Sequence, residues 1–194
     1  MSKRSYTFPI IFLIAGLFFS SCLNSDDDNE IDEEWKQFNE SEFHKTQDDP
    51  DFTRLNSTSN EGYIYWKESS VITDSDKELR ISDNGNPLFT DSIVCRYEGW
   101  FFTKEGEKII FDSTENPIYG SSVNPNKIEK KYAVADMIEG FRTALQNMKA
   151  GDEREIVIPW FMAYGTSTKG IIPAFTTLWF DIKIIRVIEM KGKK

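Results

Sequence analysis

The side chains that usually carry enzyme chemistry are scarce in this sequence. His44 is the single histidine among 194 residues, and it lies in an acidic N-terminal stretch. Nucleophilic triads need an imidazole beside the nucleophile, and histidine-rich metal sites need several. The glycines never occur as G-x-G, and both the dinucleotide and the P-loop fingerprints are absent. We therefore expect no cofactor, no metal and no nucleotide chemistry.

Aromatic side chains and one carboxylate are the remaining candidates for chemistry. Phe, Tyr and Trp together make up 14% of the chain. Asp112 follows Phe111 in an apolar run, where a carboxylate is costly to bury unless it has a partner. By periodicity alone, Phe111, Phe141 and Phe180 also fit an ordinary core between a sheet and a helix. The pattern leaves open whether these rings fill a core or line a hollow.

The elements that must position these residues are mostly strands. Alternating or apolar runs predict strands over residues 63–66, 92–102, 108–113, 153–158 and 176–187. Met137, Phe141, Leu145 and Met148 follow at helical spacing and predict one helix, which a glycine ends. Residues 114–131 are polar and interrupted by proline and glycine, so we expect a loop there. One helix against an antiparallel sheet indicates the α+β class.

Residues 1–21 have the organisation of a signal peptide. Lys3 and Arg4 precede an apolar run over 10–19, which is too short to span a membrane comfortably. The following Phe-Ser-Ser-Cys resembles a bacterial lipobox, so we expect lipidation of Cys22, as by palmitate, and anchoring in the cell envelope, at the outer membrane. An ordinary secretory signal that happens to contain this cysteine is the alternative.

Residues 22–60 are predicted to be an acidic linker between the anchor and the folded domain. From Leu23 to Leu55 there are twelve Asp or Glu against three Lys or Arg, a net charge of −9 that equals that of the whole chain. Such a segment extends by self-repulsion, and the acidity argues against a nucleic-acid partner. The Leu-Asn-Ser-Asp-Asp-Asp stretch after Cys22 resembles the acidic export tract of surface lipoproteins in the Bacteroidota.

A short amphipathic helix is expected within this linker. Ile31, Trp35 and Phe38 fall at positions i, i+4 and i+7, on one face of a helix. A solvated spacer has no need of a tryptophan, so we expect the helix to pack on the chain's own folded domain. Docking on a partner, or a helix that is only marginally stable by itself, are the alternatives.

One folded domain is expected over residues 61–190, and short motifs within 80–188 resemble a known family. Seven segments occur in the order found in the FKBP-type peptidyl-prolyl cis-trans isomerases: C-R-Y-E-G at 95–99, F-D-S at 111–113, M-I-E-G-F at 137–141, M-K-A-G at 148–151, I-P with A-Y-G at 158–165, G-I-I-P at 170–173 and L-W-F-D at 178–181. Each motif is weak alone, but their shared order on the predicted elements is specific. The chain resembles a lipoprotein form of this family.

The resemblance implies a bent antiparallel sheet wrapped around one short helix, with an apolar aromatic pocket on the concave face. It implies catalytic positions at Asp112, Tyr164 and Phe180, and substrate-binding positions at Tyr97, Phe111, Met137, Ile138, Phe141 and Ile172. The backbone N–H of Ile172 and the hydroxyl of Tyr164 would hold substrate carbonyls, and the carboxylate of Asp112 would orient the reacting group.

The function implied by the resemblance is rotation about X-Pro bonds in secreted or envelope proteins. Its partners would be proline-containing polypeptides and the macrolides that bind this family. Phe141 stands where the family usually has tryptophan, and the loop after Tyr164 lacks the His-Pro pair of some members. These departures leave open an FKBP-fold chaperone or binding module with weak or no isomerase activity. A structural lipoprotein whose Trp35 helix engages an envelope partner is a third possibility.

Overall fold

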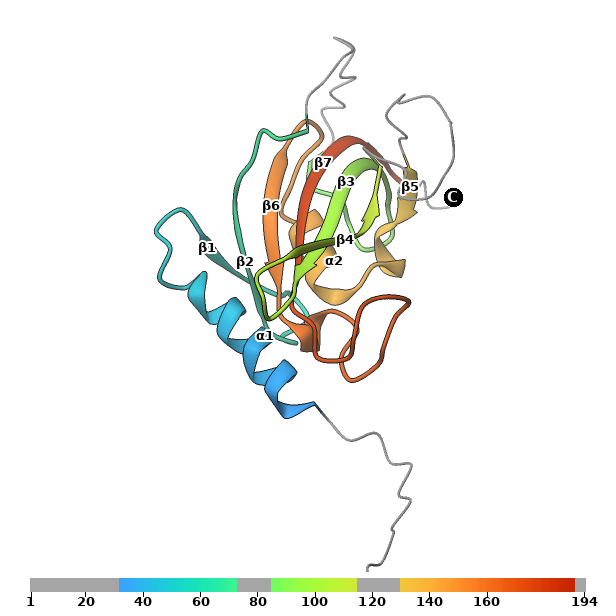
Figure 1. Cartoon of the computed structure of the whole chain (residues 1–194). Coiled ribbons are helices and arrows are strands. Elements are labelled where there is room, and N and C mark those ends of the chain that lie inside the picture. Colours follow the sequence, from blue (N-terminus) through green and yellow to red (C-terminus); the bar gives the residue numbers. More distant parts are fainter. Residues whose placement is uncertain (1–31, 73–84, 115–129, 191–194) are drawn as a thin grey trace, which may run out of the picture. The chain divides into compact units, whose positions relative to one another are not determined.

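A computed structural model describes residues 32–72, 85–114 and 130–190 (Figure 1). The expected signal peptide, Cys22 and Ile31 lie outside these residues. The elements in chain order are α1 (Glu33–Lys45), β1 (Thr53–Asn56), β2 (Tyr63–Glu68), β3 (Ser92–Phe102), β4 (Lys108–Ser113), β5 (Lys130–Ala133), the 3₁₀ turn η1 (Val134–Asp136), α2 (Glu139–Leu145), β6 (Glu153–Ile158), the 3₁₀ turn η2 (Trp160–Met162) and β7 (Leu178–Ile188). Of the described helices, none is long and apolar enough to cross a bilayer.

The strands form one antiparallel sheet in the order β1-β2-β6-β7-β3-β4, with β5 also paired to β3. β7 lies in the middle, between β6 and β3, and the strands curve around α2 (Figure 1). The register of β3 shifts between Val94 and Cys95 against β7, and between Gly99 and Trp100 against β4. Such irregularities bend a strand locally. The predicted bent sheet around a short helix is confirmed.

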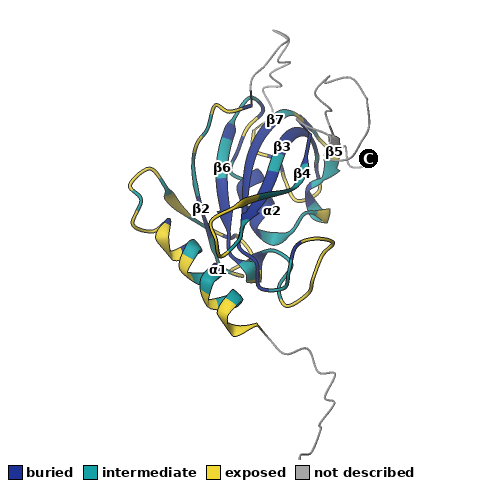
Figure 2. Cartoon of the chain, in the orientation of Figure 1, coloured by how far each residue is buried: buried dark blue, intermediate teal, exposed yellow. Residues whose placement is uncertain are grey.

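Side-chain alternation along the strands separates two apolar clusters. Ile156 and Ile158 on β6 face the larger cluster, whereas Val157 between them faces the smaller one. The larger cluster fills the space between the sheet and α2, and the smaller one lies on the opposite face of the sheet. The period of two residues in a strand is therefore what gives the sheet two apolar faces. Figure 2 shows the centre of the sheet and α2 as the most deeply buried parts of the chain.

The helix α2 packs very closely on β6. A Cβ atom on Gly140 would come 2.3 Å from Cγ2 of Ile158, so only a glycine allows this approach. Phe141, Ala144 and Leu145 then reach the larger cluster from the same helix. The helix is shorter than its apolar spacing predicts, because the residues before it form η1 and an extended pair at Met137 and Ile138.

The predicted linker helix exists as α1 and packs on the chain's own domain. Asp32 begins it, since its carboxylate accepts the N–H of Trp35 at 2.8 Å. The buried positions are Asn39 and Phe43, with Trp35 partly buried one turn earlier. Trp35, Asn39 and Phe43 follow each other at intervals of four residues and form the packed face of α1. Because the central residue is polar, a search for regularly spaced apolar side chains does not find this face.

The folded part begins earlier than the residue 61 expected from the sequence. Both α1 and β1 lie within the segment that was predicted as linker, and β1 pairs with β2 as the first strand of the sheet. β5 also falls partly in the predicted loop over 114–131. Both strands have only four residues, which is too short for alternation to be visible against their polar surroundings.

The close contact at Gly140 predicts a stability effect. We expect Gly140→Ala to lower the free energy of unfolding by about 1–3 kcal/mol, because the added methyl group must displace Ile158. Urea denaturation followed by tryptophan fluorescence measures this. Gly85→Ala is the matched control, since no atom lies within 4 Å of a Cβ there. Equal stability of the two variants would contradict the packing described here.

Candidate active site

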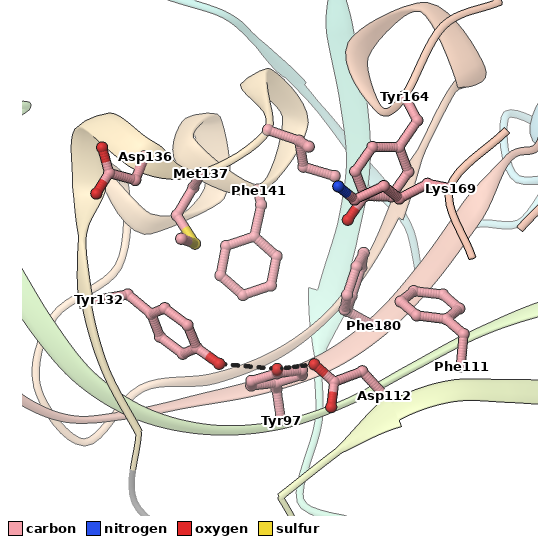
Figure 3. Close-up of a pocket in the computed structure, with 11 residues that line it drawn as sticks. Tyr97, Phe111, Asp112, Tyr132, Asp136, Met137, Phe141, Tyr164, Lys169 and Phe180 are labelled. Atoms are coloured by element: carbon pink, nitrogen blue, oxygen red, sulfur yellow. Dashed lines mark hydrogen bonds between the residues drawn. The ribbon is translucent and has the colours of Figure 1, made fainter. Parts of the chain in front are cut away.

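A cavity of about 330 Å³ lies between α2, the strands β3, β4, β5 and β7, and the segment after η2 (Figure 3). Aromatic rings make up more of its wall than any other group. The residues that line it are Tyr97, Phe111, Asp112, Tyr132, Asp136, Met137, Ile138, Phe141, Tyr164, Lys169 and Phe180.

Phe180 on β7 is the ring that joins the others. Its centroid is 5.0 Å from that of Phe141 on α2 and 5.4 Å from that of Phe111 on β4, both in edge-to-face geometry. The ring of Tyr97 on β3 lies 6.3 Å away. Pairs of this kind add about 0.5–1.5 kcal/mol each beyond the area they bury. Four elements are thus held together through one side chain.

Gly99 on β3 permits this arrangement. A Cβ atom there would lie 2.6 Å from Cε1 of Phe180 and 2.7 Å from Cζ of Phe111. The two rings therefore occupy space that any other residue would need for its own side chain. This explains why position 99, in the interior of β3, is a glycine, although glycine generally weakens a strand.

A chain of hydrogen bonds holds the carboxylate of Asp112 in the cavity wall. The hydroxyl of Tyr97 donates to Oδ2 of Asp112, and it lies 2.9 Å from the hydroxyl of Tyr132 (Figure 3). Burial, with the hydrogen bonds to Asp112 and Tyr132, raises the pKa of Tyr97 well above its usual value. The phenol therefore stays protonated and keeps the carboxylate in a fixed orientation. This supplies the partner that the sequence required for Asp112.

Tyr164 reaches the cavity from the segment between η2 and β7. It is half-buried, and burial together with the charge of Asp112 raises the pKa of its hydroxyl. The hydroxyl is therefore a hydrogen-bond donor throughout the neutral range. Figure 3 places it on the opposite side of Phe180 from Tyr132.

Glu139 fixes the first turn of α2, next to the cavity residue Ile138. Its carboxylate accepts hydrogen bonds from the hydroxyls of Ser57 and Ser59, and it pairs with Arg142. Burial by itself raises the pKa of Glu139, but these bonds outweigh burial and the pKa is lowered. The turn between β1 and β2 is thereby tied to the helix that carries Phe141.

Comparison with known proteins agrees with this geometry. Residues 85–185, which are 101 of the 194 residues, match the FKBP_C family, described as FKBP-type peptidyl-prolyl cis-trans isomerase. The chain belongs to this family of isomerases. It is 24% identical to the macrophage infectivity potentiator of Trypanosoma cruzi, with 96% of this chain and 87% of that protein covered. It is 30% identical to an FK506-binding protein of Neisseria meningitidis, with 50% and 80% covered.

Other relatives are longer, and the chain spans 42% of human FKBP14. Among solved structures, a peptidyl-prolyl cis-trans isomerase from Pseudomonas syringae pv. tomato aligns with a TM-score of 0.58 at 23% identity, covering 81% of this chain and 96% of that one. This likeness establishes the fold that the two chains share.

The structure brings nearly all of the predicted site residues of this FKBP-type chain to one cavity. Eight of the nine predicted positions line it: Asp112, Tyr164, Phe180, Tyr97, Phe111, Met137, Ile138 and Phe141. Ile172 does not. Its side chain is 4% exposed and packs in the larger core cluster, while the neighbouring Ile171 is 54% exposed. The turn over 169–172 directs one isoleucine into the core and the other into solvent.

Three lining residues were missed by the sequence reasoning: Tyr132, Asp136 and Lys169. Tyr132 lies on β5, a strand of four residues that begins inside the predicted loop over 114–131, so its period of two could not be read. Asp136 and Lys169 lie in a 3₁₀ turn and a loop, where no periodicity indicates which way a side chain points. The position of Tyr132 five residues before Met137, at the start of an apolar stretch, was the only available signal.

The raised pKa values of Tyr97 and Tyr164 predict how stability depends on pH. Above about pH 10 the unfolded chain loses phenolic protons that the folded chain retains. The unfolded state then binds fewer protons, so the free energy of unfolding falls as the pH rises. Tyr97→Phe should make this decline shallower. Urea denaturation between pH 8 and pH 11 tests it, and identical slopes for the two proteins would contradict the prediction.

Proposed function

We propose that this FKBP-type chain catalyses rotation about X-Pro peptide bonds in secreted or envelope polypeptides. The observation that best supports the proposal is that the rings of Tyr97, Phe111, Phe141 and Phe180 surround one cavity, in whose wall the hydroxyl of Tyr97 holds the carboxylate of Asp112. Such a cavity offers a proline ring an apolar surface and offers an amide few polar contacts.

The reaction needs no proton transfer, metal or cofactor. Amide resonance sets a rotational barrier of about 18–20 kcal/mol, and unaided X-Pro isomerisation takes tens to hundreds of seconds. The planar imide is dipolar and is favoured by water, whereas the twisted transition state has lost this charge separation. A cavity that excludes water therefore destabilises the planar form relative to the twisted one. Each ~1.4 kcal/mol of that difference accelerates rotation about tenfold.

In this proposal the cavity residues divide into two roles. Phe180, Phe141 and Phe111 provide the apolar contact for the proline ring. Asp112, held by Tyr97, lies beside the reacting carbonyl and orients it through electrostatics. Because burial keeps Tyr97 and Tyr164 protonated, neither phenol ionises between pH 6 and pH 9. Both act as fixed donors in that range.

The backbone donor that holds a substrate carbonyl is reassigned from Ile172 to Ile138. The N–H of Ile172 donates to the carbonyl of Lys169 at 3.0 Å and is not available. Ile138 lines the cavity, and its N–H has no acceptor among residues 32–72, 85–114 and 130–190. We assign to this N–H and to the hydroxyl of Tyr164 the two hydrogen bonds that hold the polypeptide.

Exchange spectroscopy by NMR on short X-Pro peptides tests the activity. We expect the wild-type chain to accelerate cis-trans exchange, and Phe180→Leu and Asp112→Asn each to lower kcat/KM about tenfold or more, a loss of about 1.4 kcal/mol of transition-state stabilisation. Leucine is preferred to alanine because Phe180 is 5% exposed, and truncating a buried Phe to Ala costs about 3–5 kcal/mol of stability.

Lys149→Ala is the control for this experiment, since that side chain is exposed and lies outside the cavity. Full activity in Phe180→Leu would show that the cavity is not the site. No acceleration by the wild-type chain, together with intact binding of an unfolded client, would favour the chaperone or binding module.

We also propose that the chain is held at the outer membrane through lipid on Cys22. The supporting observations are the positively charged start, the short apolar run and the Phe-Ser-Ser-Cys sequence. We expect the wild-type protein to sediment with membranes and Cys22→Ser to be lost from that fraction. Immunoblotting of fractionated cells measures this, and an unchanged distribution of the variant would refute the anchor.

A further inference from the structure

The segment between β6 and β7 carries Tyr164 and forms one side of the cavity. We call residues 159–177 the rim segment. Two backbone hydrogen bonds close it: Gly165 N–H donates to the carbonyl of Trp160, and Phe175 N–H donates to the carbonyl of Gly165, both at 2.9 Å. Because Gly165 directly follows Tyr164, the position of Tyr164 depends on where the two ends of the rim segment are held.

The C-terminal end of the rim segment is bonded to α1. The side-chain oxygen Oδ1 of Asn39 accepts the N–H of Thr177 at 2.8 Å, and the hydroxyl of Thr177 donates to the Asn39 carbonyl at 2.9 Å. Asn39 is 1% exposed and Thr177 is 0% exposed. One turn earlier in the helix, Nε1 of Trp35 donates to the hydroxyl of Thr176 at 3.1 Å, and that hydroxyl donates to the carbonyl of Pro173 at 2.7 Å.

The N-terminal end of the rim segment contacts the same helix. Nε1 of Trp160 donates to Oε1 of Glu40 at 3.2 Å. The ammonium group of Lys36 lies 6.0 Å from the ring centroid of Trp160 and 5.7 Å from that of Phe175, and the two rings are 5.0 Å apart. Consecutive turns of α1 therefore hold both ends of a loop whose middle reaches the cavity.

The backbone conformation at Phe175 indicates that the C-terminal end of the rim segment is held firmly. Its φ is 60°, in the left-handed region that residues other than glycine adopt only when surrounding contacts impose it. Phe175 is buried, at 7% exposed, between the loop-closing bond to Gly165 and the ring of Trp160. The hydrogen bonds from α1 to Thr176 and Thr177, the two residues that follow, add to these contacts.

Asn39 also determines the register in which α1 packs on the domain. A helix of 13 residues is marginal by itself, so α1 depends on its docking contacts. Sliding α1 by one turn would leave Oδ1 of Asn39 and the N–H of Thr177 buried without their partners, which is costly. The register that satisfies Asn39 is also the one that brings Trp35 and Glu40 to the rim segment.

We infer that α1, which lies outside residues 85–185 matched to the family, is part of the active unit, and that Trp35, Asn39 and Glu40 are positioning residues that act through Tyr164. This inference rests on the proposed function, in which the Tyr164 hydroxyl holds the substrate. Phe180, Phe111, Asp112 and Phe141 are positioned by the sheet and α2 instead. Loss of the α1 contacts therefore weakens substrate binding and leaves the rotation step itself unaffected.

Substitutions that remove single contacts test this in the full chain. Trp35→Phe keeps a ring against the core and removes the indole donor, and Glu40→Ala removes the acceptor for Trp160. We expect the double variant to raise KM for an X-Pro peptide about fivefold and to change kcat less than about twofold, as for one lost hydrogen bond. As a single substitution in the wild-type chain, Glu40→Gln keeps an acceptor oxygen and should leave KM unchanged. Gln37→Ala, on the exposed side of α1, is the matched control.

Measuring the same double variant in a Tyr164→Phe background separates an effect on the position of Tyr164 from a general loss of stability. If α1 acts through the Tyr164 hydroxyl, the double variant raises KM in the wild-type background but not in Tyr164→Phe. An equal rise in both backgrounds, or no rise in either, overturns the inference. All proteins are compared at a temperature at which circular dichroism shows each to be folded.

A second readout does not require activity, so it separates failure of this inference from failure of the proposed function. In ¹³C-tyrosine-labelled protein, the Tyr164 ring signal is assigned by its absence in Tyr164→Phe. We expect Trp35→Phe/Glu40→Ala to shift or broaden this signal and to leave that of Tyr132 unchanged, since Tyr132 lies on β5 across the cavity. An unmoved Tyr164 signal overturns the inference even if the wild-type chain proves to be inactive.

Discussion

The absence of a side chain at Gly99 is the constraint on which the rest of the site depends. The rings of Phe180 and Phe111 lie against β3 within a distance that no Cβ atom would tolerate. Phe180 on β7 can then meet Phe141 on α2 edge to face, and the four rings stay apart around a cavity of about 330 Å³. Protein interiors are otherwise packed without such voids. A larger residue at this one position would push the rings into the cavity.

A carboxylate among these rings needs a hydrogen-bond donor, and a tyrosine hydroxyl supplies it. Asp112 is half-buried among the rings, and the hydroxyl of Tyr97 donates to it while lying beside that of Tyr132. Burial of the phenol favours its neutral form, so the donor is not lost in the neutral pH range. The result is a fixed charge in an apolar site, which suits an orienting role for Asp112 better than an exchange of protons.

The N-terminal segment, which lies outside residues 85–185 matched by the family model, adds to the folded domain on two sides. β1 and β2 add to the sheet beyond β6, and the turn between them binds Glu139 through Ser57 and Ser59. The helix α1 binds the rim segment at both of its ends. Segments that lie outside the family match thus hold two parts of the cavity wall, the start of α2 and the loop that carries Tyr164. An acidic sequence that looks like a spacer becomes part of the folded unit from α1 onward.

The sequence by itself determined the class of fold and the bounds of β3, β4 and β6, because alternation and helical spacing are local properties of the chain. Eight of the cavity residues followed from the ordered short motifs and the family that these motifs resemble. The sequence could not determine that Asn39 lies at the centre of a docking face, that Tyr132 lies on a strand, or that the N–H of Ile172 is already bonded to Lys169. Each of these depends on which distant donor meets which acceptor. Only the tertiary structure decides that, since a polar side chain has the same sequence signature whether its partner is water or a buried backbone group.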